Sequence, residues 1–387
     1  MDAFTFHNPV KVIFGKGQIA ALSRAVPKGA RVLLAYGGGS IKANGVHGQV
    51  VAALAGAGLS VVEFGGIEPN PRFETLMKAV ALARAERLDF VLAVGGGSVV
   101  DGCKFLCAAI PHASDPWDIL TSRGGTVTAA VPLGVVLTLP ATGSEMNFFS
   151  VVSREETREK LSFGHPLVTP RFSILDPETT FSLPERQLGN GIVDAFVHVL
   201  EQYLTVPAGA MIQDRFAESI LKTLVEVAPD AMAVPADFDA RANLMWAATM
   251  ALNGLIGAGV PQDWSTHFIG HEITAIAGID HARTLAAVWP GMVAVKRDGK
   301  RAKLLQYAKR VWHMGKGDED ERIDAAVAST RAFWESVGVA TSLSALGLPA
   351  SIADEVAARL EARGGLPLGE HGDIDAGQVR AILRAAY

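Results

Sequence analysis

Side chains able to bind a metal ion gather in two apolar stretches of the second half of the chain. Asp194 and His198 lie in GIVDAFVHVLEQY, whose apolar residues recur at the i, i+3 and i+4 spacing of a helix. This separation puts two side chains on one helix face, with Cβ atoms roughly 5–6 Å apart, which suits two ligands of one cation. His267, His271 and His281 follow in QDWSTHFIGHEITAIAGIDHARTLA. Imidazoles combined with a carboxylate are typical of a catalytic divalent metal that keeps one position open.

A structural interpretation of the same residues stands beside this one. A single histidine on an apolar helix face is usually a hydrogen-bonded core residue, and Asp194 and His198 could form a buried ion pair. Four of the ten histidines of the chain nevertheless fall in these two segments. That concentration beside an aspartate favours a metal site.

Length and composition indicate two domains and exclude several classes of partner. The chain has 387 residues, more than the roughly 250–300 at which a single core stops growing. Hydrophobic residues make up 49% and charged ones 19%, so a folded core is expected. The net charge is −5, with no basic block that would indicate nucleic-acid binding. No uncharged run of ~20 apolar residues predicts a membrane span.

The cysteines and the N-terminal segment indicate a cytoplasmic protein. Cys103 and Cys107 lie one helical turn apart, a poor geometry for a disulfide, and unpaired buried thiols fit a reducing compartment. MDAFTFHNPVKVIFGKG has no continuous apolar stretch of the kind that signal peptides carry. Residues 4–14 alternate apolar and polar side chains around Pro9, as an edge strand or hairpin does. An exposed edge strand favours pairing into a homodimer.

The first half of the chain alternates apolar strands with helices. Strands are expected at 31–36, 59–64, 89–94, 134–139 and 172–175, with helices at 44–56 and 73–87 and a further one after Ser98. Near-continuous apolar strands between helices predict a parallel sheet that is covered on both faces.

After Leu183-Pro184-Glu185-Arg186 the pattern becomes entirely helical, and proline near a first helical turn is an expected start signal. The expected helices are 186–204, 211–228, 238–256, 264–277, 281–297, 300–312, 319–337, 351–363 and 375–386. We therefore expect an α/β domain over residues 1–184 and an all-helical domain over residues 185–387.

Glycine-rich turns follow two of the predicted strands. Gly95-Gly96-Gly97-Ser98 lies between a buried strand and a helix start, where glycines admit a pyrophosphate close to the backbone and unpaired N–H groups can bind it. The run differs from the Gly-x-Gly-x-x-Gly fingerprint, and alone it could be a tight turn. Its place at the carboxyl end of a parallel strand favours phosphate binding. Asp101 could bond a ribose or the substrate, or belong to the first helical turn.

A second polar turn, LTLPATGSE, also follows an apolar strand. The hydroxyls of Thr138 and Thr142 could hold adenine, ribose or phosphate, and Lys160 could add a positive charge. Local turn hydrogen bonds and a solvated lysine are the structural alternatives.

The turn Tyr36-Gly37-Gly38-Gly39-Ser40 bears on the choice of nicotinamide cofactor. NAD-selective folds place an acidic residue after an early strand, where it accepts from the ribose 2′-hydroxyl and repels a 2′-phosphate. This turn carries no acid and offers space and donors instead. The sequence therefore predicts NADP over NAD.

These motifs together resemble the iron-containing alcohol dehydrogenase family, and most closely its NADP-dependent aldehyde reductase and butanol dehydrogenase branch. The resemblance spans essentially the whole chain and rests on YGGGSIK, EFGGIEPNP, AVGGGSVVDGCKF, LTLPATGSEMN, DAFVHVLEQY and NGLIGAGVPQDWSTHFIGHEITAIAGIDHARTLA. It implies a Rossmann-like dinucleotide-binding domain before a helical metal-binding domain, an architecture like that of dehydroquinate synthase. It also implies reduction of small aldehydes to primary alcohols, and the reverse oxidation.

The resemblance also implies roles for individual residues. The implied metal ligands are Asp194, His198, His267 and His281, whereas spacing alone favours His267 with His271. The implied cofactor contacts are Gly37, Gly38, Ser40, Gly95, Gly96, Gly97, Ser98, Asp101, Thr138, Thr142, Asn147 and Lys160. Fe2+ or Zn2+ is the expected metal, because both suit this ligand set.

The expected mechanism polarises the aldehyde oxygen at the metal, and His271 is a candidate proton relay or a hydrogen-bonding neighbour of the ligands. Phe148 and Phe149 depart from the branch, in which small residues are usual, and could narrow the site or pack as core. Two rival functions remain: a lyase of the dehydroquinate synthase type that uses NAD transiently, and a non-catalytic protein that binds a metal or a nucleotide.

Overall fold

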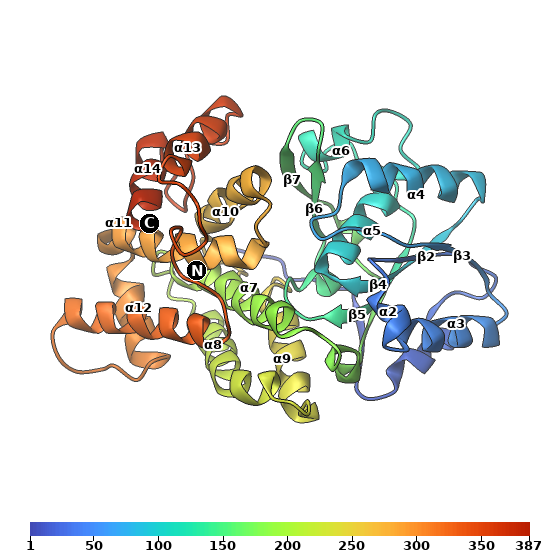
Figure 1. The fold of residues 1–387 in the computed structure, drawn as a ribbon, viewed down its shortest axis with the longest axis horizontal. Helices are drawn as coiled ribbons and strands as arrows, with labels where there is room; N and C mark the ends of the chain where they lie inside the picture. Colours follow the sequence, from blue (N-terminus) through green and yellow to red (C-terminus); the bar gives the residue numbers. More distant parts are fainter. The chain divides into compact units, whose positions relative to one another are not determined.

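The computed structural model describes residues 1–387, which divide into two compact units (Figure 1). The sheet unit consists of His7–Leu183 and Ala236–Thr249, and the helical unit of Met1–Phe6, Pro184–Pro235 and Met250–Tyr387. The sequence predicted that residues 1–184 form one domain and residues 185–387 the other. In the structure, Met1–Phe6 instead belongs to the helical unit and Ala236–Thr249 to the sheet unit.

A six-stranded sheet forms the centre of the sheet unit, with neighbouring strands in the order β1-β8-β5-β4-β2-β3 and every pair parallel. The strands are β1 Lys11–Phe14, β2 Arg31–Tyr36, β3 Ser60–Phe64, β4 Phe90–Gly96, β5 Leu133–Leu139 and β8 Phe172–Leu175. β1 lies at an edge, as expected, but it begins at Lys11 and is not part of a hairpin. The carboxyl ends of β2, β4 and β5 therefore lie side by side.

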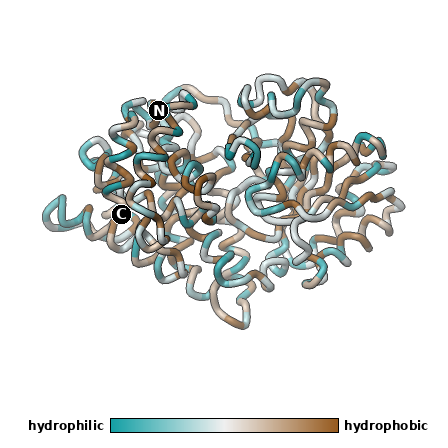
Figure 2. The backbone as a smooth tube through the Cα atoms, turned by 45° about the horizontal axis from the view of Figure 1, so that its top comes forward, coloured by the Kyte–Doolittle hydropathy of each residue, from teal (hydrophilic) through white to brown (hydrophobic).

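Alternate residues of each strand face different helical layers, which explains why the strands are apolar throughout. In β2, Leu33 and Ala35 pack with α4 (Phe73–Ala85) and α5 (Gly97–Ala109). Val32 and Leu34 pack on the opposite face, with α1 (Leu22–Ala25) and α3 (Val46–Gly56). Figure 2 shows long hydrophobic stretches within this unit and hydrophilic ones in its loops. Burial on both faces is the arrangement that parallel strands require.

An antiparallel hairpin of β6 (Phe149–Arg154) and β7 (Glu159–Gly164) was not expected from the sequence. Its strands are rich in serine and charged residues, so they lack the apolar run of the central strands. The remaining short elements of this unit are η1 Gln18–Ala21, α2 Ser40–Ala43, α6 Asp118–Thr121, η2 Ser144–Met146, η3 Pro166–Val168 and η4 Pro177–Thr180.

Helix α9 (Phe238–Ala251) explains why residues 236–249 belong to the sheet unit. Buried Arg241 donates to the backbone oxygen of Thr180, and Thr249 donates to the buried carboxylate of Glu145 at 2.5 Å. Side-chain contacts at both ends of the segment thus attach it to the sheet unit.

The helical unit contains α7 Glu185–Tyr203, α8 Met211–Met232, α10 Ser265–Ala277, α11 His281–Arg310, α12 Glu319–Ser336, α13 Ile352–Ala362 and α14 Ala376–Ala385. The two helices expected at 281–297 and 300–312 form the single helix α11, which continues through Pro290 and Gly299. Packing against α7, α10, α12 and α14 outweighs the cost of about 1 kcal/mol that a glycine adds to a helix. No helix in the chain has the length and apolarity to cross a membrane.

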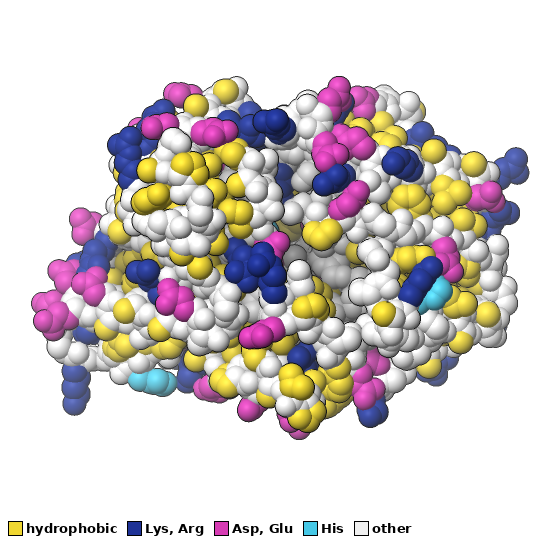
Figure 3. Space-filling view, in the orientation of Figure 1, with side chains coloured by type: hydrophobic (Ala, Val, Ile, Leu, Met, Phe, Trp, Pro, Cys, Tyr) yellow, Lys and Arg dark blue, Asp and Glu magenta, His cyan; other side chains and the backbone are white.

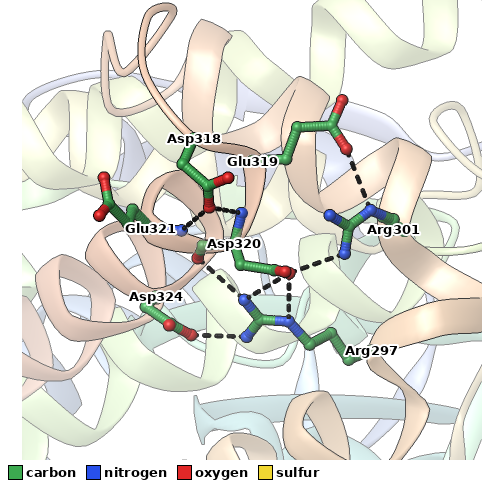
Figure 4. Close-up of polar contacts among 7 residues, drawn as sticks. All are labelled: Arg297, Arg301, Asp318, Glu319, Asp320, Glu321 and Asp324. Atoms are coloured by element: carbon green, nitrogen blue, oxygen red, sulfur yellow. Dashed lines mark hydrogen bonds and ion pairs between the residues drawn. The ribbon is translucent and has the colours of Figure 1, made fainter.

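Ion pairs attach α12 to α11 at the surface of the helical unit. Arg297 contacts Asp320 and Asp324, and Arg301 contacts Glu319 and Asp320 (Figure 4). Figure 3 shows acidic and basic side chains gathered over this part of the unit. The acidic residues occupy the first turns of α12, where the helix dipole favours negative charge. This exposed network contributes modestly to stability.

Candidate functional site

Helix α7 presents a polar stripe inside the helical unit. Asp194 and His198 are only 4% and 5% exposed, and the imidazole Nε2 of His198 lies 3.9 Å from Oδ1 of Asp194. The helix begins directly after Pro184, with Glu185 in its first turn, where the dipole favours an acid. The four-residue spacing therefore places both side chains on one buried face, as the sequence predicts.

Two further helices bring imidazoles to Asp194. His267 lies in the first turn of α10, and His281 is the first residue of α11. One ligand-type atom from each of Asp194, His267 and His281 lies within 4.8 Å of the other two. Nε2 of His281 is 3.9 Å from Oδ1 of Asp194, the same distance as Nε2 of His198.

This cluster fits a divalent cation. Bonds of roughly 2.0–2.2 Å allow two ligand atoms of one ion to lie up to about 4.4 Å apart. The 3.9 Å separations fall within this limit, and the 4.8 Å that encloses the whole group lies close to it. A carboxylate as buried as that of Asp194 needs positive charge or hydrogen bonds nearby. Two imidazoles, those of His198 and His281, lie 3.9 Å from its Oδ1, and imidazoles bind metals when they are neutral.

His198 and His271 lie beside the cluster. The ring of His198 stacks on that of His267 with centroids 4.8 Å apart, and His271 lies 4.7 Å from the His281 ring and 6.3 Å from the His267 ring. His271 is partly exposed and is not one of the three residues whose ligand atoms converge. Spacing alone favours His267 and His271 as a pair of ligands. The structure instead brings His267 together with Asp194 and His281.

Buried charges that were not among the predicted site residues hold the start of α10. Lys300 donates to the carboxylate of Glu370 at 2.7 Å and lies 2.9 Å from that of Asp263. Asp263 accepts at 2.9 Å from the backbone N–H of Ser265, the first residue of the helix that carries His267. Burial opposes the charge of Lys300, but Asp263 and Glu370 outweigh it, and the pKa of Lys300 is raised. The start of α10 is thus anchored to α11.

In the sheet unit, the expected phosphate turns lie next to each other at the carboxyl ends of β4 and β5. Gly95 and Gly96 end β4 at a register irregularity, and Gly97 begins α5. A Cβ on Gly97 would lie 2.4 Å from Oγ1 of Thr142, so this glycine lets the two turns touch. Thr142 in turn accepts from the backbone N–H of Ser144 at 3.1 Å. This edge of a parallel sheet is the usual place for a bound nucleotide.

A buried lysine that was not among the predicted site residues links these turns. Lys104 of α5 is 0% exposed and donates to Oγ of Ser144 at 2.7 Å, to Oδ1 of Asn147 at 2.8 Å and to the backbone oxygen of Phe149 at 2.7 Å. Burial lowers the pKa of Lys104 to about 8, although the neighbouring carboxylates favour its charge. The sequence could have indicated this role, because Lys104 follows Asp101 by one turn in a helix that begins at the glycine turn.

Asp101 and Asn147, both expected cofactor contacts, are engaged in this network. The Asp101 carboxylate accepts from Oγ of Ser144 and from the backbone N–H of Val151. The Asn147 amide donates to the backbone oxygen of Gly143 at 2.9 Å and its oxygen accepts from the N–H of Phe149 at 2.9 Å. Both side chains therefore shape the turn after β5.

Lys160 is buried and ordered by a contact that the sequence did not reveal. Its Nζ donates to Oδ1 of Asn70 at 2.9 Å, and the backbone N–H of Asn70 donates to Oγ of Ser98 at 3.2 Å. Asn70, in the left-handed region at φ 55°, joins the hairpin to the glycine turn. The structure thus brings Ser98 and Lys160 into one group.

The turn after β2 carries no acid, but β3 supplies one beside it. The Glu63 carboxylate accepts from the hydroxyl of Tyr36 at 2.9 Å and lies 3.0 Å from Nε2 of His47 and 3.6 Å from Nζ of Lys42. Burial raises the pKa of Glu63, but hydrogen bonds from His47 and Tyr36 outweigh it, and the pKa is lowered. Figure 3 shows histidine, basic and acidic side chains together near α2 and α3. The Glu63 carboxylate is thus already engaged by His47 and Lys42.

Phe148 and Phe149 are not core residues. They are 39% and 47% exposed, and their rings contact each other with centroids 4.5 Å apart. Both rings approach Gly164 of β7, where a side chain would collide with them. Of the two alternatives expected from the sequence, packing as core is wrong.

The family comparisons cover nearly the whole chain. Residues 9–177 match the model described as iron-containing alcohol dehydrogenase, and residues 190–387 match the model for the C-terminal part of the Fe-containing alcohol dehydrogenase family. Together these matches include the glycine turns, the cluster around Asp194 and all the expected site residues.

Individual relatives agree with these matches. The chain is 56% identical over the full length of both proteins to the NADPH-dependent aldehyde reductase YqhD of Escherichia coli strain K12. It is 40% identical, again over both full lengths, to the probable NADH-dependent butanol dehydrogenase 1 of Bacillus subtilis strain 168. The crystal structure of E. coli YqhD superposes with a TM-score of 0.98 at 55% identity, covering 100% of this chain and 99% of that one. The chain therefore belongs to the iron-containing alcohol dehydrogenase family.

Proposed function

We propose that the chain catalyses the metal-dependent, NADPH-linked reduction of small aldehydes to primary alcohols, and the reverse oxidation. The observation that carries the proposal is the buried convergence of Asp194, His267 and His281 in a chain that is 56% identical to an NADPH-dependent aldehyde reductase. A carboxylate among imidazoles suits a catalytic divalent metal, and full-length similarity makes the same chemistry the expected one.

Asp194, His198, His267 and His281 are the proposed ligands of one divalent ion, Fe2+ or Zn2+. His198 is included because its Nε2 lies as close to Oδ1 of Asp194 as that of His281 does. An ion held there would act as a Lewis acid on the aldehyde oxygen. Burial of Asp194 and His198 keeps water away, which strengthens electrostatic interactions in the site.

His271 is the proposed proton donor to the developing alkoxide. It is partly exposed, so it can exchange protons with solvent, and its ring lies 4.7 Å from that of His281. Imidazole titrates near neutral pH, which suits a relay.

NADPH is the proposed hydride donor, since the nicotinamide supplies that chemistry. The proposed cofactor contacts are Gly37, Gly38, Ser40, Gly95, Gly96, Gly97, Ser98, Asp101, Thr138, Thr142, Asn147 and Lys160. The acid-free turn after β2 supports NADPH over NADH, as does the cofactor named for the 56% identical relative. Asp101 and Asn147 would contribute through the turn that they shape, because hydrogen bonds within the unit already engage them.

A homodimer and a cytoplasmic location stay predictions from the sequence. The edge position of β1 supports pairing with a second copy.

A screen of NADPH oxidation with short and medium aldehydes, with iron and zinc measured on the same sample, tests the proposed function. We expect turnover with stoichiometric formation of the primary alcohol, a clear preference for NADPH over NADH, and about one metal ion per chain. A lyase would consume no NADPH overall, and a binding protein would show cofactor affinity without turnover. Either result would reject the proposal.

A further inference from the structure

Helix α7 carries a third acidic or imidazole side chain on the same face as Asp194 and His198. Glu201 follows at i+7 from Asp194 and is 5% exposed. The spacings of four and seven residues place all three side chains along one stripe of the helix. None of the roles assigned so far uses Glu201.

The carboxyl of Glu201 contacts His267 of α10 at two points. Its Oε1 accepts from the backbone N–H of His267 at 3.2 Å and lies 3.5 Å from the ring nitrogen Nδ1. The backbone oxygen of Glu201 also accepts from the N–H of Asp263 at 2.8 Å. One residue of α7 thus holds both the start of α10 and the ring that α10 presents to Asp194.

We propose that Glu201 is a positioning residue that orients the His267 imidazole for metal binding. The inference rests on the proposed function, because it assumes that His267 is a ligand. With Nδ1 turned toward the carboxyl of Glu201, Nε2 is the nitrogen left to bind an ion. A carboxylate behind a metal-binding histidine sets which nitrogen carries the proton and makes the imidazole a better ligand.

Stability alone does not account for an acid at this position. A buried carboxyl costs free energy unless its partners compensate, and Glu201 lies near the carboxylate of Asp263. The positive charge that acts on Glu201, that of Lys300, is already paired with Asp263 and Glu370. Leucine or methionine would fill a similar volume in an apolar helix without that cost. The contact with His267 supplies a reason for the acid.

The metal affinity of Glu201→Leu is the direct test. Apoprotein would be titrated with Zn2+ against a competing chelator, with thermal unfolding of the apoprotein as the check on folding. We expect the dissociation constant to rise roughly 10–100-fold in Glu201→Leu. Glu201→Gln keeps an acceptor facing Nδ1 and should recover most of the affinity.

Glu218→Leu is the matched control. Glu218 is a buried acid in the neighbouring helix α8, where it accepts from the hydroxyl of Tyr203 at 2.8 Å. Its loss should lower thermal stability while leaving the dissociation constant for Zn2+ unchanged. A second control repeats Glu201→Leu in a His267→Ala background, where it should have no further effect on metal affinity because its target is gone.

The outcomes separate this inference from the proposed function. If the unaltered chain binds Zn2+ and reduces aldehydes, but Glu201→Leu binds Zn2+ as tightly, the inference about Glu201 is wrong and the proposed function stands. If the unaltered chain binds no metal, both fail. Should Glu201→Leu not fold, Glu201→Asp withdraws the carboxyl by one methylene, and an unchanged affinity in that variant would equally overturn the inference.

Discussion

Nζ of Lys104 donates to Oδ1 of Asn147 at 2.8 Å, and both side chains are buried in the sheet unit. The contact joins α5, which begins at the glycine turn after β4, to the turn that follows β5. Ser144 and the backbone oxygen of Phe149 bind the same ammonium group at 2.7 Å. The two turns proposed to hold the nucleotide thus depend on one buried charge.

Replacing Lys104 with methionine should weaken NADPH binding. Methionine fills a similar volume but cannot bind Ser144 and Asn147, so the turn after β5 loses its anchor. We expect a rise of about tenfold in the dissociation constant for NADPH, equivalent to roughly 1.4 kcal/mol, measured by fluorescence of the bound nucleotide. Lys303→Met, at a buried lysine of the helical unit that binds Asp214, should leave NADPH affinity unchanged.

Lys104 should also make the stability of the unaltered chain depend on pH, and Lys104→Met should remove that dependence. Burial lowers the pKa of Lys104 to about 8 in the folded state, below its usual 10.5. Between these two values the unfolded chain binds more protons, so this group adds stability as the pH rises. From pH 8 to about pH 9.5 the unfolding free energy should increase by roughly 2 kcal/mol more in the unaltered chain than in Lys104→Met. Parallel pH profiles from urea unfolding would contradict this account.

An aspartate at position 38 should reverse the cofactor preference. Gly38 has open space around its Cβ position and needs no left-handed backbone, whereas Gly39 has φ 101° and would be strained by a side chain. A carboxylate at position 38 would repel a 2′-phosphate and accept from a 2′-hydroxyl. We expect the ratio of kcat/KM for NADPH to that for NADH to fall roughly 10–100-fold, about 1.4–2.7 kcal/mol. Gly38→Asn matches the shape without the charge and should change the ratio much less.

Replacing Asp194 with asparagine should remove the metal and the activity together. The substitution keeps the shape of the side chain but removes the negative charge that two imidazoles face at 3.9 Å. Metal content after dialysis should fall well below one ion per chain, and aldehyde turnover should fall at least 1000-fold, about 4 kcal/mol. Asp354→Asn, on the surface of α13, should retain both. Full metal content in Asp194→Asn would show that the ion binds elsewhere.

Changing His271 to asparagine separates proton transfer from metal binding. Because His271 lies outside the group of converging ligand atoms, metal content should stay intact. Turnover should fall roughly 100-fold, as expected for loss of a general acid, and the near-neutral limb of the pH–rate profile should flatten. Loss of the metal in this variant would instead identify His271 as a ligand.

Local sequence patterns were sufficient for the main elements of both units. Strands β2 and β8 have the expected bounds, because apolar runs between turn residues are typical of strands buried on both faces. The i, i+4 spacing of Asp194 and His198 likewise placed both on one face of α7, since helix geometry alone decides which neighbours share a face. The hairpin of β6 and β7 was not foreseen, because its strands lack that apolar run.

Contacts between residues far apart in the chain were decided by tertiary structure. His281 reaches Asp194, Lys160 reaches Asn70, and Glu201 reaches His267 because helices and strands pack at particular angles and depths, which no local spacing encodes. The burial of Lys104 has the same origin: its charge is tolerated because residues 40 and more positions later fold over it with oxygen acceptors. Residue type and spacing thus determined which side chains could do chemistry. Packing decided which of them meet, because the free energy of a contact depends on all the elements that surround it.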